Sequence, residues 1–324
     1  MFDQIPPAVI DFVRNVFREA NDSVTAVLTT HPSMHEETLD HQLIMKSVAT
    51  PPTFFANENI AVEIETHWLG GRRQFGRWEI ADIALFILLR QNGKLIEQKV
   101  ALLQTKRLYS KEISVTGLDE ADYVIGIARL SQRTDPLVPL TRQRAFSFNG
   151  NCVYGAMAAG SSQITHIEDY VKKRRIPVYY NFYNPPQLPY GSLYPATAGA
   201  IPLVRNSLGC RVISSKDAHA ALAKVVAGKS PTFDEMAIPE RTEKSDDFSS
   251  HGWRLEAFIA DEVLRCREGR LFIDSNDQDL AILLGGRAAP IASAISITID
   301  IGGKTDAPVT PRTHRRRLLR RPPS

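Results

Sequence analysis

Two long apolar segments joined by a short polar turn constrain the fold of this chain more than any other feature. Residues 79–90 read EIADIALFILLR, and residues 94–108 read KLIEQKVALLQTKRL. The connection between them, Gln91-Asn92-Gly93, contains the Asn-Gly pair that favours a tight turn between antiparallel strands. The pattern therefore predicts a β-hairpin whose strands belong to the core.

Polar residues interrupt both strands of this hairpin. Asp82 lies inside the first apolar run, and Gln104 and Lys106 follow the end of the second. An ionised carboxylate in a core strand costs on the order of several kcal/mol unless a partner compensates its charge. A metal ion is one such partner. These three residues are therefore candidates for a metal-dependent site.

The length of the turn decides whether Asp82 and Gln104 share a face of the hairpin. A two-residue turn would place Asp82 opposite Leu103, on the face away from Gln104, because side chains alternate along a strand. A three-residue turn that includes Gln91 would place Asp82 opposite Leu102 and diagonal to Gln104. We predict the three-residue turn.

A second polar pair, Glu97 and Lys99, has the commoner acid–x–lysine form. It lies only four residues beyond the turn, roughly 20 Å along the strand from the level of Asp82 at about 3.3 Å per residue. We therefore interpret Glu97 and Lys99 as exposed charges at the tip of the hairpin.

The remainder of the chain alternates between helical and extended patterns. Helices are predicted over residues 10–20, 34–49, 161–175 and 253–266, and strands or apolar runs over residues 61–69, 123–130, 176–185 and 291–301. Ser33 and Glu36 have the spacing of a capping box at the start of the second helix. Residues 50–59 are expected to be irregular, and residues 228–251 to form a long surface loop.

This order of elements predicts an α/β fold in which helices flank a central mixed sheet. Residues 1–190 would form the core domain. Residues 191–304 would form an extension that packs on the core or mediates recognition or dimerisation, and residues 305–324 a disordered basic tail.

Composition narrows the setting in which the chain acts. Among its 324 residues, no apolar run is long enough for a spanning helix, and the N-terminus lacks the pattern of a signal peptide. The three cysteines are widely spaced, which favours a reducing cytoplasm. The net charge of +3 is concentrated in the tail, so the rest of the chain is slightly acidic.

Through Asp82, Gln104 and Lys106 the chain resembles the PD-(D/E)xK nuclease superfamily, in the variant that has glutamine in place of the second acid, as in Mrr-like restriction enzymes. The resemblance covers roughly residues 33–110 and, more loosely, the helix and strand through residue 185. It implies a restriction-endonuclease-like core. The proline of the family motif is absent, since Ala81 precedes Asp82.

The resemblance also implies a role for each residue. Asp82 and the amide of Gln104 would bind Mg²⁺, for which Mn²⁺ can substitute, and the carbonyl of Thr105 would be an additional ligand. Lys106 would orient or activate the attacking water and stabilise charge on the phosphate. The alternative is that Asp82 and Lys106 form a buried salt bridge in a scaffold without activity.

A glutamate from the preceding helix often completes the site in this family. Glu37 fits its spacing, because Leu43 and Ile44 follow at the distance seen in those helices. Glu36 lies nearer the apolar face of the helix and remains open as a substitute.

Several arginines are candidates for binding DNA phosphates, with solvated surface positions as the alternative. They are Arg72, Arg73 and Arg77 before Asp82, Arg107 after Lys106, and Arg315, Arg316 and Arg317 in the tail. Residues 71–78 approach the Walker A pattern but lack its lysine and hydroxyl residue. The aromatic residues of segment 179–183 would either stack on bases or belong to the core.

We expect a cytoplasmic, magnesium-dependent DNA endonuclease that acts on double-stranded DNA, as a homodimer or with a partner subunit, and without a membrane. A prokaryotic restriction or antiphage role is implied by the resemblance alone. Two other functions stay open: a non-catalytic nucleic-acid-binding or assembly protein on a degenerate nuclease fold, and an RNA-directed nuclease.

Overall fold

The computed structural model describes residues 2–69, 80–113, 144–194, 196, 199, 201–204, 206–239, 248–274, 277–284 and 290–302. Several expectations lie outside these ranges. They concern Arg72, Arg73, Arg77 and the loop 71–78, the apolar run 123–130, and the tail with Arg315, Arg316 and Arg317.

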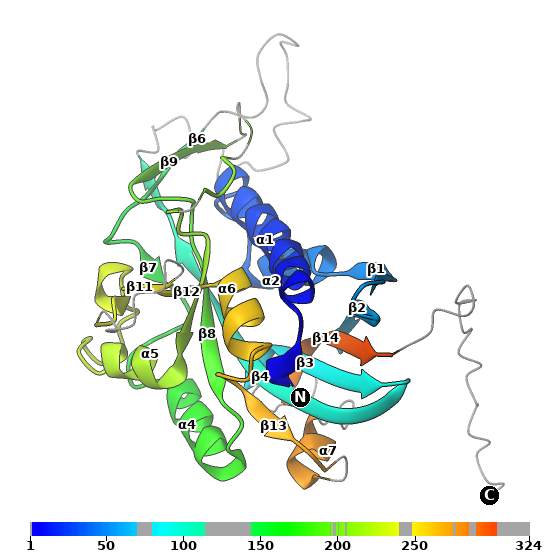
Figure 1. Cartoon of the computed structure of the whole chain (residues 1–324). Coiled ribbons are helices and arrows are strands. Elements are labelled where there is room, and N and C mark those ends of the chain that lie inside the picture. Colours follow the sequence, from blue (N-terminus) through cyan, green and yellow to red (C-terminus); the bar gives the residue numbers. More distant parts are fainter. Residues whose placement is uncertain are drawn as a thin grey trace, which may run out of the picture.

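A large mixed β-sheet forms the centre of the molecule, with helices on its faces (Figure 1). Its strands follow the order β1-β2-β14-β3-β4-β8-β10-β12-β11, and β7 and β13 pair with β4 outside this path. Strands β14 and β3 are parallel, as are β4 and β8, whereas the other pairs are antiparallel. A smaller sheet has the order β5-β6-β9.

The strand bounds are β1 Ala49–Phe55, β2 Ile60–Trp68, β3 Ala81–Gln91, β4 Lys94–Tyr109, β5 Lys111–Ile113, β6 Arg144–Phe148, β7 Val153–Tyr154, β8 Val178–Tyr183, β9 Tyr190–Tyr194, β10 Cys210–Ser214, β11 Phe248–Ser249, β12 Gly252–Arg254, β13 Arg270–Phe272 and β14 Ile291–Ile301. The helices are α1 Pro7–Thr30, α2 Glu36–Lys46, α4 Ser162–Arg174, α5 Ser215–Leu222, α6 Leu255–Ala257 and α7 Gln278–Leu284. Short 3₁₀ turns cover Phe2–Gln4 and Asp234–Met236, and α6 continues as π-helical turns over Phe258–Val263.

Helices cover both faces of the sheet around β8. On one face, Tyr183 donates a hydrogen bond to Asp40 of α2, and the ring of Tyr179 packs on Phe258 after α6, with 4.7 Å between ring centroids. On the other face, Tyr180 contacts His219 of α5. Because successive side chains of a strand point to opposite faces, α2 and α6 lie on one face of β8 and α5 lies on the other.

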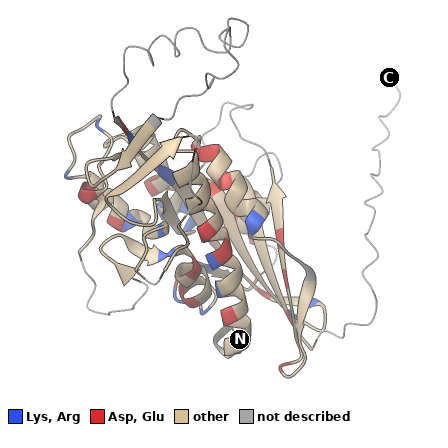
Figure 2. Cartoon of the chain, turned by 90° about the horizontal axis from the view of Figure 1, so that it is seen from above, with Lys and Arg blue, Asp and Glu red and all other residues tan. Residues whose placement is uncertain are grey.

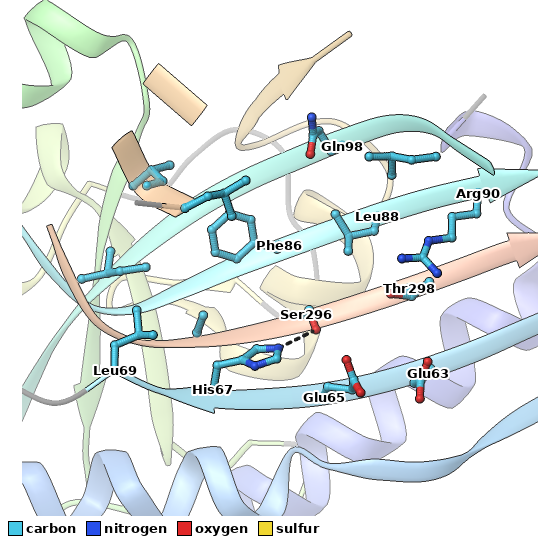
Figure 3. Close-up of a pocket in the computed structure, with 15 residues that line it drawn as sticks. Glu63, Glu65, His67, Leu69, Phe86, Leu88, Arg90, Gln98, Ser296 and Thr298 are labelled. Atoms are coloured by element: carbon cyan, nitrogen blue, oxygen red, sulfur yellow. Dashed lines mark hydrogen bonds between the residues drawn. The ribbon is translucent and has the colours of Figure 1, made fainter. Parts of the chain in front are cut away.

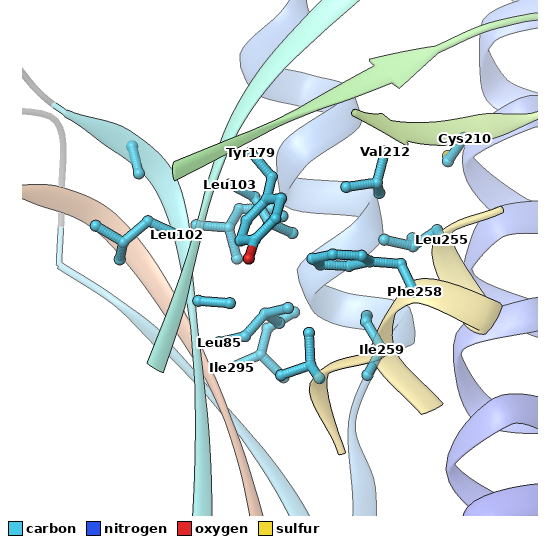
Figure 4. Packing of buried hydrophobic residues seen from close by; sticks show 14 of the residues in the cluster. Leu85, Leu102, Leu103, Tyr179, Cys210, Val212, Leu255, Phe258, Ile259 and Ile295 are labelled. Atoms are coloured by element: carbon cyan, nitrogen blue, oxygen red, sulfur yellow. The ribbon is translucent and has the colours of Figure 1, made fainter. Parts of the chain in front are cut away.

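The core lies between the sheet and the layer formed by α1, α2 and α6 (Figure 4). Leu85, Leu103 and Tyr179 of the sheet meet Leu255 and Phe258 there, and all five side chains are buried. The four aromatic residues Tyr179, Tyr180, Phe182 and Tyr183 are at most 1% exposed, so they belong to the core rather than to a base-stacking surface.

The C-terminal part of the chain completes this sheet. Strand β14 lies between β2 and β3, and β10 and β12 extend the sheet beyond β8. Residues 191–304 thus contribute strands to the central sheet itself. Within the described residues, no helix is both long and apolar enough to cross a membrane.

The hairpin of β3 and β4 forms as predicted, but its turn does not. Asn92 and Gly93 both have positive φ angles, 50° and 78°, and they form a two-residue turn between the paired residues Gln91 and Lys94. A bulge then places Ile96 as an extra residue on β4. The extra residue shifts the register by one, so Ile83 pairs with Leu103 and Asp82 stands level with Gln104. The predicted three-residue turn was wrong, yet the two side chains share a level of the hairpin.

Three other local predictions also need correction. Residues 50–59 are not irregular throughout, because β1 forms an edge strand in which Pro51 and Pro52 are tolerated. Helix α2 begins at Glu36 with His35 as its N-cap, so Ser33 makes no capping box. Lys99 is only 1% exposed and its Nζ donates to the carbonyl of Val263 at 2.8 Å. It is therefore a core lysine and not an exposed charge.

Candidate active site

The candidate site lies where β4 extends past the beginning of β3. β3 starts at Ala81, whereas β4 continues to Tyr109 and pairs there with β8 and β7. The polar residues at the end of β4 therefore have β8 on one side and the first residues of β3 on the other. Helix α2 packs against this end of β4.

Asp82 is the acceptor at the centre of the site. Its Oδ2 atom accepts hydrogen bonds from Gln104 Nε2 at 2.5 Å, from the backbone N–H of Thr105 at 2.7 Å and from Thr105 Oγ1 at 2.9 Å. Gln104 and Thr105 are buried, and Asp82 is half-buried. Because a half-buried carboxylate held by three donors is fixed in position, the start of β3 presents it in one orientation.

Lys106 pairs with an acid from α2 rather than with Asp82. Its Nζ atom is 3.3 Å from Glu36 Oε1 and donates to the carbonyl of Thr105 at 2.7 Å. Glu36 Oε2 also accepts from the backbone N–H of Arg107 at 2.9 Å. The salt bridge considered between Asp82 and Lys106 is not the arrangement found.

Glu36, and not Glu37, is the helix acid that contacts the site. Glu37 is exposed, because consecutive residues of a helix point about 100° apart. The carbonyl of Thr105, considered as a metal ligand, accepts from Lys106 instead. These two assignments are corrected by the geometry.

Asp40 is a member of the cluster that the sequence analysis missed. It follows Glu36 by four residues and therefore lies on the same face of α2. Its Oδ1 atom accepts from the hydroxyl of Tyr183 at 2.6 Å, and its side chain is 5% exposed. The spacing of the two acids was the available signal.

The three acids repel one another electrostatically. Burial, and then the charges of Asp82 and Glu36, raise the pKa of Asp40 well above its usual value. Burial also raises the pKa of Glu36, against the lowering effect of Lys106, and Asp82 raises it further. The cluster therefore holds more negative charge than the single lysine within it neutralises.

Several buried side-chain amide atoms near these acids have no hydrogen-bond partner among the described residues. Gln104 Oε1 is buried without a hydrogen-bond partner, as are both side-chain polar atoms of Asn181, which pairs with Thr105 across β4 and β8. Such an oxygen-rich set with excess negative charge suits a hard divalent cation such as Mg²⁺. Among the described residues, however, no three His, Cys, Asp or Glu side chains form a group able to hold a metal. A cation would need the amide oxygen of Gln104 together with the acids.

Arg107 does not fit the role of a DNA-binding arginine. It is 1% exposed, donates through Nη2 to the carbonyl of Pro32 at 2.5 Å, and its guanidinium lies over the ring of Tyr109. Burial lowers its pKa. Figure 2 shows acidic and basic residues interspersed over the helices, so this view contains no continuous basic stripe.

The chain matches no protein-family model, no curated protein and no solved structure.

Proposed function

We propose that this protein is a metal-dependent nuclease that hydrolyses phosphodiester bonds of DNA on a restriction-endonuclease-like core. The observation that carries the proposal is the convergence of four side chains at one point of the sheet. Asp82 and Gln104 are joined at 2.5 Å, and Lys106 and Glu36 meet beside them. Three separate segments of the chain, in α2, β3 and β4, supply these residues.

The charge of the cluster supports the same proposal. The charge of Asp82 raises the pKa values of both Glu36 and Asp40, and the charge of Glu36 raises that of Asp40, as in a site suited to a cation. Asp82, Glu36 and the amide oxygen of Gln104 would hold the ion. A bound Mg²⁺ polarises the phosphate and lowers the pKa of a water bound to it.

Side chains of the protein would keep the ligands in place and supply positive charge beside the phosphate. Asp82 and Glu36 are fixed by backbone N–H donors, so they keep their orientation without the ion. Lys106 is 2% exposed and is anchored by Glu36 and the Thr105 carbonyl. It would supply positive charge beside the scissile phosphate as negative charge develops there.

The experiment compares supercoiled plasmid, linear DNA and RNA in the presence of Mg²⁺ or Mn²⁺. Asp82→Asn and Lys106→Met should each reduce cleavage by about a hundredfold or more. Asp300→Asn, in β14 beside the hairpin turn, and Lys94→Met, at the start of β4, are matched controls, because they make the same changes at the end of the sheet away from the site. Both should cleave at the wild-type rate.

Wild-type protein that leaves all three substrates intact with either metal would overturn the proposal. Binding of DNA without cleavage would instead favour the non-catalytic nucleic-acid-binding role. Cleavage confined to RNA would identify a ribonuclease.

A further inference from the structure

A cavity of about 520 Å³ lies on the sheet away from the candidate active site (Figure 3). Strands β2, β14, β3 and β4 form its floor, and α7 forms one wall. Leu85 and Ile295 alternate with the floor residues and belong to the core beside Phe258 (Figure 4). The cavity therefore opens on the opposite face of the sheet.

Two acids project into this cavity from β2. Glu63 and Glu65 are two residues apart and so share a face of the strand. Burial and the charge of Glu65 raise the pKa of the Glu63 carboxyl, while Arg90 across the floor lowers it. Among the described residues, neither carboxylate has a hydrogen-bond or ion-pair partner. Among the described lining residues, two acids face one arginine, which leaves an excess of negative charge.

Gln98 gives a second, independent sign that a polar ligand belongs here. It lines the cavity from β4 and is only 6% exposed. Its side-chain amide has no hydrogen-bond partner within the part of the chain that the structure describes. Its amide atoms are not among the fully buried polar atoms that lack a partner, so the amide faces the open cavity, where a bound ligand would supply a hydrogen bond.

The two acids and the large apolar side chains of the lining come from different elements. Glu63 and Glu65 lie on β2, whereas Phe86 and Leu88 lie on β3, and Leu283 and Leu284 on α7 (Figure 3). A complementary ligand therefore has a charged group at one end and an apolar body at the other.

We propose that this cavity binds a small organic cation, in which an ammonium or guanidinium group is attached to an apolar body. The cation would lie between Glu63 and Glu65 and donate hydrogen bonds to their carboxylates. The apolar body would cross the floor over Leu88 and Phe86 toward Gln98, which lies three strands from Glu63. DNA phosphate is not a suitable occupant, because both carboxylates repel it. The site is also separate from the acids of the candidate active site, since Phe86 follows Asp82 by four residues, about 13 Å along the strand.

Isothermal titration calorimetry with three probes of one shape tests the proposal on the full chain. The probes are 4-phenylbutylamine, 4-phenyl-1-butanol and 4-phenylbutyrate, which differ in the charge of one terminal group. The amine should bind roughly tenfold or more tightly than the alcohol, because its hydrogen bonds to the carboxylates join opposite charges. The carboxylate should bind more weakly than either.

The variant Glu63→Gln should lower the affinity for the amine by about five- to tenfold and leave that for the alcohol unchanged. Glu19→Gln, on the exposed face of α1, makes the same change elsewhere and should alter neither. Equal binding of the three probes, no binding of the amine at millimolar concentration, or an unchanged Glu63→Gln variant would each overturn the proposal. If Glu63→Gln does not fold, competition between the amine and the alcohol for the wild-type protein tests the proposal. The amine should then displace the alcohol, and failure to do so would overturn the proposal.

Discussion

Asp40 connects the charge of the candidate site with the stability of the fold. Its carboxyl is buried, bonded to Tyr183 and close to two other acids. A raised pKa means that the folded state holds the proton more tightly than the unfolded chain does. Stability is therefore lost as pH rises above about 4, the pKa of an aspartate in an unfolded chain.

Replacing Asp40 with asparagine should remove this loss, because the amide cannot ionise and its oxygen can still accept from Tyr183. We expect Asp40→Asn to be more stable than the wild type by about 1–2 kcal/mol at pH 8. The gain should shrink as pH falls to 4.5. Urea unfolding at the two pH values measures it.

Asp217→Asn is the control, since this acid lies away from the site, in the first turn of α5, where it accepts a hydrogen bond from the N-cap Ser214. A loss of stability at pH 8 would mean that Asp40 is ionised and compensated in the folded protein. A gain of equal size at both pH values would mean that the gain does not arise from ionisation of Asp40.

At the level of single residues, the sequence was informative where the relevant contacts are local. Asp82, Gln104 and Lys106 stand out because each is polar within an apolar strand. The hydrogen bond between Tyr183 and Asp40 joins residues 143 positions apart, so no local sequence pattern predicts it. The choice of Glu36 over Glu37 depends on the first residue of α2, which the mistaken capping box at Ser33 placed too early.

At the level of elements, the bulge at Ile96 brings Asp82 level with Gln104. The two-residue turn alone would leave them on different faces. The pattern of apolar residues predicted both strands, but it carries no signal for one extra residue inside β4. β1 was missed for a related reason, because its two prolines resemble a loop until its position at the edge of the sheet is known.

Deleting Ile96 should therefore preserve the alignment of the site, because only the unpaired residue is removed. Deleting Val100, beyond the bulge, should shift Gln104 and Lys106 to the other face and unfold the core. We expect a cost of about 1 kcal/mol for the first deletion, as for a typical single change. The second should leave no cooperative transition. Circular dichroism during urea unfolding distinguishes them.

Both variants lose one residue from the same strand, so each serves as the control of the other. Equal damage from the two deletions would show that the bulge does not set the register.

For the whole molecule, the position of β14 makes the chain one cooperative unit. It pairs in parallel with β3 and antiparallel to β2, both of which come from the first third of the chain. The sequence predicted the strand itself, from the run Ile291–Ile301, but not its place. Pairing between strands so far apart depends on the assembled sheet and not on local residues.

A chain that ends at Leu284 should therefore fail to fold, although it retains every residue of the candidate site. A chain that ends at Gly302 keeps β14 and should unfold in a single transition like the full chain. Tryptophan fluorescence and circular dichroism should give the same midpoint for this control. A cooperative transition for the shorter chain would show that β2, β3 and β4 form a stable unit alone.

The central position of β14 also has a consequence for synthesis on the ribosome. After Gln91 has emerged and until Ile291 follows, the edge of β2 and the edge of β3 that pair with β14 in the folded protein lack this partner strand. At typical translation rates of 5–20 residues per second, this interval lasts on the order of 10–40 s. A nascent chain with exposed apolar strand edges for that long is a natural client of chaperones.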